Sequence, residues 1–246
     1  MALKGECFRE QKGRLTQRIK LGEKYYFIKQ HFGVGFKEIF KNILQGRWPV
    51  LSAKNEWLAI NKLQSLGIAV AKAWGFGLKG SNPARLQSFI LMEELTPVIS
   101  LEELGKTWRT NSPRFDLKLK LIKEVAHIAR TLHQNGLNHR DFYLCHFLLD
   151  LSGDKSILKN PQAPLKLFLI DLHRTQIRAN APKRWIIKDL GGLYFSSVEL
   201  GLTQRDCLRF IKYYHATQSL REILTSKGKF WHKVKMRGEK LYHDHL

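Results

Sequence analysis

The sequence predicts an α+β protein of two lobes, in which a strand-rich antiparallel lobe with one helix precedes a mainly helical lobe. Two observations predict this class. Short aromatic and β-branched runs, separated by glycine-containing turns, fill the first part of the chain as in a β-meander. Apolar residues at helical spacing fill most of the second part, interrupted by one pair of short apolar runs. The lobes are expected to cover residues 1–95 and 96–246.

The first lobe is defined by strand-forming runs that end at turn residues. Breaks at Gly13 and Gly22 separate its first three strands. The apolar spacing then becomes helical, with Ser52 as the N-cap and Gly67 as the terminating glycine. The expected strands cover residues 6–10, 15–21, 25–29 and 88–92, and the expected helix covers residues 52–66.

The second lobe begins with a long amphipathic helix. Ser112 is expected to cap this helix with Pro113 at its first position, and Asn135 with Gly136 ends it. The two short apolar runs that follow are expected to pair as a hairpin, and the rest of the chain is expected to be helical. The runs cover residues 147–149 and 165–170, the hairpin loop covers 152–164, and the later helices begin near residue 188.

The charge balance points to an anionic partner. The chain has 42 Lys and Arg against 21 Asp and Glu, a formal net charge of +21 at pH 7. Nucleic acid, an anionic membrane face, phosphorylated substrates and acidic proteins would all be attracted. A basic solvated surface with no specific partner is the alternative.

The composition excludes several classes of protein. Hydrophobic residues make up 43% of the chain, enough for a core, which excludes disorder for most of it. No apolar run approaches the roughly 18 residues of a membrane-spanning helix, and the first ten residues lack the apolar region of a secretory signal. The three cysteines are widely spaced with no CxxC pair, which favours a reducing compartment, by default the cytoplasm.

Glu56 and Lys29 form the first candidate pair. Glu56 shares a helix face with Ile60 and Leu63, where a carboxylate is costly unless it is paired or reaches solvent at the helix edge. Lys29 ends an aromatic strand. A strand lysine paired with a helix glutamate holds nucleotide phosphates in kinase-like folds. Where the later strand 88–92 ends, Glu94 is a further candidate nucleotide contact.

The triplet His139-Arg140-Asp141 follows the long helix and its glycine cap. In kinases the aspartate of this triplet orients or accepts the proton of the acceptor hydroxyl, and the residue five places later holds a metal ion. That later residue is His146 here. Imidazole can bind a divalent metal, although Mg²⁺ prefers oxygen. The alternative for His146 is a core histidine bonded to the backbone.

Asp171 ends the second apolar run, in the order Asp-Leu-His where protein kinases have Asp-Phe-Gly. A carboxylate in this place suits a metal ion that bridges the β and γ phosphates. The missing glycine makes an in/out switch of this segment doubtful. The alternative is an aspartate that caps the next turn.

Some expected motifs are absent, and other chemistries fit less well. There is no glycine-rich phosphate loop, so Gly13 and its hairpin would have to cover the phosphates, helped by Lys12, which lies outside the residues that the structure describes, or by Arg14. Cys145 beside His146 could indicate zinc or a thiol nucleophile, but the spacing fits no common zinc pattern. No nucleic-acid-binding signature is present, so nucleic acid is not expected as a partner.

Three segments resemble those of the lipopolysaccharide core heptose(I) kinases, of the lipopolysaccharide kinase family. The similarity extends over Lys24–Tyr214, and that family also carries histidine at the position of His146. The segments are Asn138–Leu149, Ile170–Arg178 and Lys183–Ser197, with Gly201–Asp206 following.

The resemblance implies a protein-kinase-like fold and a cytoplasmic enzyme of Gram-negative bacteria. Such enzymes transfer the γ-phosphoryl group of ATP to the 4-hydroxyl of the first heptose of the lipopolysaccharide inner core, at the inner face of the inner membrane. By position, Asp141 is then the catalytic base. Lys29 and Glu56 hold the α and β phosphates, and Asp171 and His146 hold Mg²⁺ or another divalent metal.

The resemblance also explains why the chain would be basic. The acceptor carries phosphates and Kdo carboxylates, the membrane face is anionic, and guanidinium groups suit both anions. The resemblance suggests acyl carrier protein, an acidic protein, as a further partner. The candidate acceptor residues, which could also form a solvated basic loop, are Arg174, Arg178, Lys183, Arg184 and Lys188.

Two other functions stay open at this point. One is a kinase of the same fold that acts on Kdo or on a protein hydroxyl. The other is a non-catalytic basic module that binds a membrane or nucleic acid, against which the pair Asp141 and Asp171 argues.

Overall fold

The structure is a computed structural model, and it describes residues 5–11, 13–33, 35–44, 51–152, 157, 158, 160 and 162–245. No helix in these ranges is long and apolar enough to cross a membrane. The chain divides into two compact units. Unit 1 comprises residues 1–65, 70–95 and 171–174, and unit 2 comprises residues 66–69, 96–170 and 175–246.

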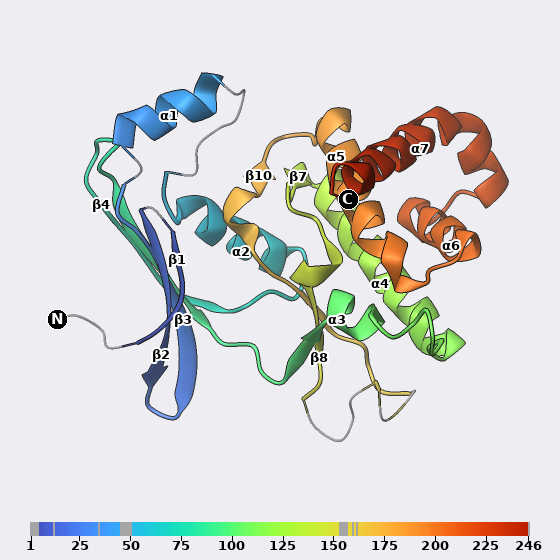
Figure 1. The fold of residues 1–246 in the computed structure, drawn as a ribbon, viewed down its shortest axis with the longest axis horizontal. Helices are drawn as coiled ribbons and strands as arrows, with labels where there is room; N and C mark the ends of the chain where they lie inside the picture. Colours follow the sequence, from blue (N-terminus) through green and yellow to red (C-terminus); the bar gives the residue numbers. More distant parts are fainter. Residues whose placement is uncertain are drawn as a thin grey trace. The chain divides into compact units, whose positions relative to one another are not determined.

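Unit 1 is built on a five-stranded antiparallel sheet (Figure 1). Alternating residues of the central strands, such as Ile28 and Ile90, are buried. Ile60 and Leu63 of the second helix, which contacts β4 and β5, are buried too. The order across the sheet is β1-β2-β3-β5-β4. The strands are β1 Glu6–Gln11, β2 Arg14–Leu21, β3 Lys24–His31, β4 Ala73–Lys79 and β5 Gln87–Glu93.

Unit 1 contains two helices where the sequence predicted one. They are α1 Gly35–Leu44 and α2 Lys54–Ser65, and the short 3₁₀ helix η2, Leu172–Arg174, packs on α2. The Ser52 hydroxyl accepts a hydrogen bond from the backbone N–H of Lys54 at 3.3 Å, as predicted for the cap of α2. Gly67 has φ +77°, which only glycine adopts without strain, and it follows the end of this helix as predicted.

Unit 2 is mainly helical. The helix α4 ends before Asn135 and Gly136 as predicted, but it begins at Phe115 after Arg114, so Ser112 and Pro113 lie outside it. Its apolar face, including Leu121 and Leu132, is buried. The helices are α3 Leu101–Gly105, α4 Phe115–Gln134, α5 Lys183–Ser197, α6 Gln204–His215 and α7 Leu220–His243, with 3₁₀ turns η1 Leu144–His146 and η3 Val198–Leu200.

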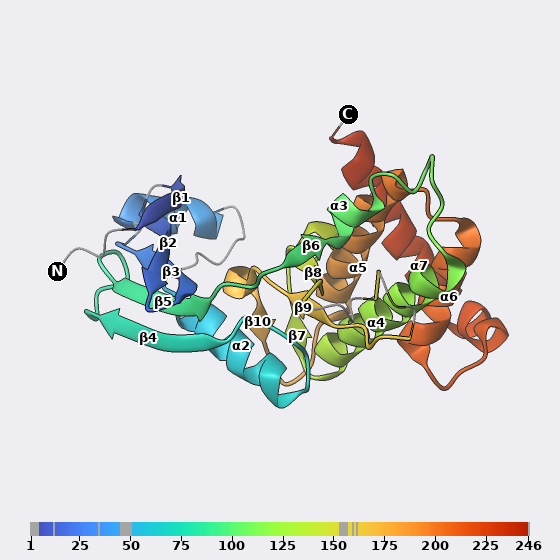
Figure 2. The ribbon, with the colours of Figure 1, turned by 90° about the horizontal axis from the view of Figure 1, so that it is seen from below.

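Two small antiparallel sheets complete unit 2. The predicted hairpin is present, with Phe147 paired to Leu169, and part of its loop lies outside the described residues. The helices α5 and α7 lie side by side, as Figures 1 and 2 both show. The strands are β6 Val98–Ser100, β8 Phe147–Asp150 and β9 Leu167–Leu169 in one sheet, and β7 Leu137–Asn138 with β10 Gln176–Ile177 in the other.

Candidate active site

One group of candidate residues is an ion pair in unit 1. Lys29 lies on β3, and its Nζ is 2.6 Å from Oε1 of Glu56 in the first turn of α2. The Glu56 side chain is only 2% exposed, and within the described residues its second oxygen, Oε2, has no hydrogen-bond partner. A buried carboxylate of this kind needs the lysine, so the pair fixes the Lys29 ammonium in one place.

Asp171 joins this pair. Its Oδ1 is 3.8 Å from Lys29 Nζ and 2.5 Å from Nδ1 of His173. Asp171 has φ +60°, a left-handed conformation that is uncommon for a residue with a side chain. Because such backbone strain persists only where its surroundings enforce it, the placement of this carboxylate is specific to the fold.

The charges around Lys29 set its protonation. Burial would lower the pKa of the Lys29 ammonium, but Glu56 and Asp171 outweigh burial and raise the pKa above its ordinary value. The nearby Arg14 guanidinium has its pKa lowered, chiefly by burial. The unit therefore places a fixed positive charge beside a carboxylate, an arrangement that can bind phosphate and a divalent cation together.

The remaining nucleotide candidates lie in the same unit. Gly13 has φ +77° in the turn between β1 and β2, and its carbonyl accepts a hydrogen bond from the N–H of Phe32 at 2.9 Å. Glu94 makes a two-pronged ion pair with Arg18, at 2.9 Å for each contact. The Glu94 carboxylate is therefore already paired with a residue of β2.

A separate group of candidate residues is the loop 138–146 in unit 2. The carboxylate of Asp189, on α5, accepts the backbone N–H of His139 at 2.7 Å and of Arg140 at 2.8 Å. Asp189 is 1% exposed, and Arg140 has φ +76°. The buried carboxylate thus holds the backbone on the N-terminal side of Asp141 in a conformation that would otherwise be costly.

The two histidines of this loop have defined tautomers, because each bonds to a carbonyl oxygen, which can only accept. His146 donates from Nδ1 to the Asp141 carbonyl at 2.7 Å. His139 donates from Nε2 to the Ile170 carbonyl at 3.0 Å, and its pKa is lowered, chiefly by burial. The His146 proton is then on Nδ1 and not on Nε2, which is the tautomer usual for metal-binding histidines.

The five acceptor candidates are not equivalent. Arg178 donates to Oδ1 of Asn138 and to Oε1 of Gln176, both at 2.6 Å, so its guanidinium ties β10 to β7. Arg174 lies in η2 of unit 1. The other three, Lys183, Arg184 and Lys188, are exposed on the first two turns of α5.

Sequence reasoning missed Asp189 and Trp185. Asp189 lies beside the buried Leu190 on α5, and an aspartate on an apolar helix face is the same signal that identified Glu56.

Within the described residues no group of three or more His, Cys, Asp and Glu could hold a metal ion, which leaves the zinc hypothesis for Cys145 without a ligand set.

The fold and these residues define a class. A kinase-like phosphotransferase combines an antiparallel sheet that carries a lysine–glutamate pair with a helical unit that carries a histidine–arginine–aspartate loop, as this chain does. The profile of the lipopolysaccharide kinase (Kdo/WaaP) family matches residues 1–214, and the chain belongs to this family. The predicted two-lobed kinase-like α+β fold is thereby confirmed.

Several relatives are close in sequence. The chain is 47% identical over 239 residues to a lipopolysaccharide core heptose(I) kinase WaaP of Escherichia coli K12, covering 97% of this chain and 88% of the relative. It is 44% identical over 241 residues to the enzyme of that name from Pseudomonas aeruginosa PAO1, covering 98% and 88%. A solved structure of WaaP in complex with acyl carrier protein aligns with a TM-score of 0.82 at 40% identity, over 98% of this chain and 90% of that one.

Proposed function

We propose that this chain transfers the γ-phosphoryl group of ATP to the 4-hydroxyl of the first heptose of the lipopolysaccharide inner core, in the cytoplasm at the inner face of the inner membrane. The supporting observation is that two relatives named lipopolysaccharide core heptose(I) kinase WaaP are 44–47% identical to this chain over nearly its whole length. The intact pair of Asp141 and Asp171 argues for an active enzyme rather than a non-catalytic module.

Each residue has a role that its surroundings support. Lys29, fixed by Glu56, would bind the α and β phosphates, and Gly13 would cover them with its hairpin. Asp141 would orient the acceptor hydroxyl and take its proton. Glu94 would serve the nucleotide only indirectly, through the strand end that it holds with Arg18.

The ligand chemistry fits a divalent cation. Asp171 offers a carboxylate and His146 an imidazole whose proton is on the other nitrogen, so these two residues would hold Mg²⁺. When bound, such an ion neutralises charge that develops on the phosphates. Arg174, Arg178, Lys183, Arg184 and Lys188 stay the candidates for the anionic groups of the acceptor.

A labelled-ATP assay with a panel of acceptors tests this function. The panel holds a core that ends in heptose, a core that ends in Kdo, and a generic protein. Label in the heptose core alone supports the proposal. Label in the Kdo core or in the protein would overturn the acceptor assignment, and label in none would overturn the enzymatic one.

Acyl carrier protein is the proposed protein partner. The net charge of +21 complements an acidic protein, and the related WaaP was solved with acyl carrier protein. Unit 2 also contains a mainly apolar pocket of about 700 Å³ that is open to solvent, lined by residues such as Leu121, Val125, Leu193, Phe210 and Trp231. An acyl chain fits such a lining, so acylated carrier protein should co-elute with this chain and unacylated carrier protein should not.

A further inference from the structure

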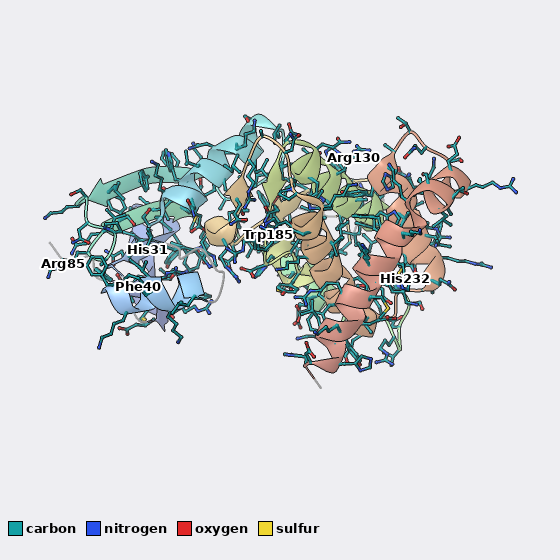
Figure 3. All side chains as sticks on the ribbon, turned by 90° about the horizontal axis from the view of Figure 1, so that it is seen from above. His31, Phe40, Arg85, Arg130, Trp185 and His232 are labelled. Carbon is teal, nitrogen blue, oxygen red and sulfur yellow. The ribbon has the colours of Figure 1, made fainter. Side chains whose placement is uncertain are left out.

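Three cations gather on one indole in unit 2. The Arg140 guanidinium carbon is 5.2 Å from the centroid of the Trp185 ring, the Arg184 carbon is 5.4 Å from it, and the Lys188 ammonium is 4.4 Å from it. All are within cation–π range. Arg140 comes from the catalytic loop and the other two from α5, so the indole joins the two elements. Trp185 is labelled in Figure 3.

This arrangement concentrates positive charge at the start of α5. Arg184 and Lys188 are four residues apart on a helix, where like charges repel. The first turn of α5, all of whose residues are described, carries Lys183 and Arg184 and no acidic residue, which opposes the helix dipole. Among the described residues, Arg184 has no acidic partner.

The cluster is also adjacent in sequence to Asp141, the proposed base. Arg140 immediately precedes Asp141, and the buried Asp189 fixes the Arg140 backbone. Within the described residues the Trp185 indole nitrogen Nε1 finds no hydrogen-bond acceptor, so packing and the cations position the ring. An anion held by Arg140 would therefore be held at a defined place relative to the Asp141 backbone.

We infer that Arg140, Trp185, Arg184 and Lys188 form a binding site for one anionic substituent, a phosphate or a carboxylate, of the sugar acceptor. Trp185 is its specificity-determining residue, because it collects the three cations. The guanidinium groups match the two oxygens of either anion, and the ammonium adds a point charge. This inference rests on the proposed function in one respect, namely that the acceptor is an anionic sugar.

Steady-state kinetics with the heptose core test the cations. The double variant Arg184→Gln/Lys188→Gln should raise the KM for the acceptor about tenfold or more, the effect expected for a lost charge-assisted hydrogen bond, and leave the KM for ATP unchanged. Lys229→Gln/Lys233→Gln on α7 removes the same charge from exposed positions and is the matched control. Equal effects of the two double variants, or no effect of the first, would overturn the inference.

The indole is tested separately. Trp185→Leu keeps apolar bulk and all cations but removes the ring face, so it should also raise the acceptor KM and spare the KM for ATP. Trp185→Phe retains a weaker ring face and should fall between the wild type and Trp185→Leu, which keeps the test open if the leucine variant fails to fold. A wild-type acceptor KM in Trp185→Leu would exclude the indole from the site.

Equilibrium binding separates this site from the enzymatic proposal. Deacylated core oligosaccharide, with its phosphates or after phosphatase treatment, is titrated while tryptophan fluorescence is recorded. A fluorescence change that occurs in the wild type but not in Trp185→Phe reports binding at this site. If only the phosphorylated probe causes it, the bound group is a phosphate, and if both probes cause it, the bound group is a carboxylate. Binding without turnover would keep the site and refute the function. The same titration in Trp185→Phe as in wild type would refute the site.

Discussion

Asp141 lies in a loop whose preceding backbone N–H groups are bonded to Asp189. The loop is anchored independently of the Asp141 side chain, so Asp141→Asn should keep the loop in place and remove only the base. We expect kcat to fall by about 10²–10⁴-fold, with the dissociation constant for ATP unchanged. Asp116→Asn, the same change at an exposed position, is the control, and wild-type turnover in Asp141→Asn would rule out the assignment.

Lys29 and Glu56 should behave as one unit. Lys29→Ala would leave the Glu56 carboxylate buried without its cation, which costs about 3–5 kcal/mol of unfolding free energy. Lys29→Ala/Glu56→Ala removes both charges, so its cost should be clearly less than the sum of the single variants. Denaturant unfolding and kcat/KM measure the cycle, and additive losses in both would show that the two residues do not act together.

His31 should make the fold sensitive to mild acid. Burial first, then Arg14, His173 and Lys29, lower the pKa of His31 to about 4 from its ordinary 6.5. The unfolded state therefore binds this proton more readily than the folded state, and stability falls as the pH drops from 6.5 towards 4, by about 3 kcal/mol in all.

His31→Phe tests this pH dependence. The variant should lose that part of the slope of unfolding free energy against pH, measured by denaturant titration. The same change at the exposed His232 is the control and should leave the slope in place (both residues are labelled in Figure 3). An unchanged slope in His31→Phe would show that another group is responsible.

The sequence was most informative about residues that break a pattern. Glu56 on an apolar helix face predicted a buried partner, and the structure pairs it with Lys29 at 2.6 Å. Arg178 was different, because a basic residue in a basic segment does not reveal that Asn138 and Gln176 accept its hydrogen bonds. Such contacts join residues far apart in the chain, and no local spacing encodes them.

The helix α6 begins with a complete capping box. The Thr203 side chain accepts the N–H of Asp206, and the Asp206 carboxylate accepts the N–H of Thr203 at 3.0 Å. Asp206 also contacts Lys118 at 2.9 Å and Arg209 at 2.7 Å, and it is 2% exposed. Burial alone would raise the pKa of Asp206, but the hydrogen bonds from Thr203 and the ion pair with Lys118 together lower it to about 2.

Asp206→Asn should therefore destabilise the protein by about 2 kcal/mol at neutral pH. Because the folded-state pKa lies below the ordinary value of 3.8, this stability is present above pH 3.8 and is lost as the pH falls towards 2. Chemical denaturation of both proteins at pH 7 and pH 3 measures the difference. If the difference in unfolding free energy between the wild type and Asp206→Asn is as large at pH 3 as at pH 7, the Asp206 carboxylate is not its source.

Elements with strong patterns were predicted, and those without were missed. The three strands from Glu6 to His31 are separated by clear turns, and β3 has an aromatic run, whereas β4 contains Gly75 and Gly77, which lower its strand propensity. A Cβ at position 77 would lie 2.3 Å from a ring atom of Phe89 on the paired strand, so a larger residue there would displace this exposed ring. The start of α4 was placed at Ser112, but the structure begins this helix after Arg114 without a side-chain cap.

At the scale of the molecule, the charge of +21 should act on the acceptor rather than on ATP. The three α5 cations Lys183, Arg184 and Lys188 are exposed, and exposed charges are screened over about 8 Å at physiological ionic strength. Lys29 is largely buried in its ion pair, and its charge is screened less.

Raising the salt concentration should therefore raise the KM for the lipopolysaccharide acceptor and leave the KM for ATP nearly constant. Arg184→Glu should reproduce the effect of high salt at low salt, for the acceptor only. If the acceptor KM does not move between low and high salt, the basic surface does not dock the acceptor, and acyl carrier protein becomes the first partner to test.

Unit 1 contains residues 171–174 although the rest of it ends at residue 95. During synthesis, Lys29 and Glu56 leave the ribosome on the order of ten seconds before Asp171, at usual rates of elongation. The sheet and α2 can form in that interval, but the second carboxylate beside Lys29 arrives only after α4, β8 and β9 have been made. A nascent chain released before residue 171 would thus carry a lysine–glutamate pair with no aspartate next to it, so an interrupted translation product would lack one of the residues proposed to bind the nucleotide and its metal ion.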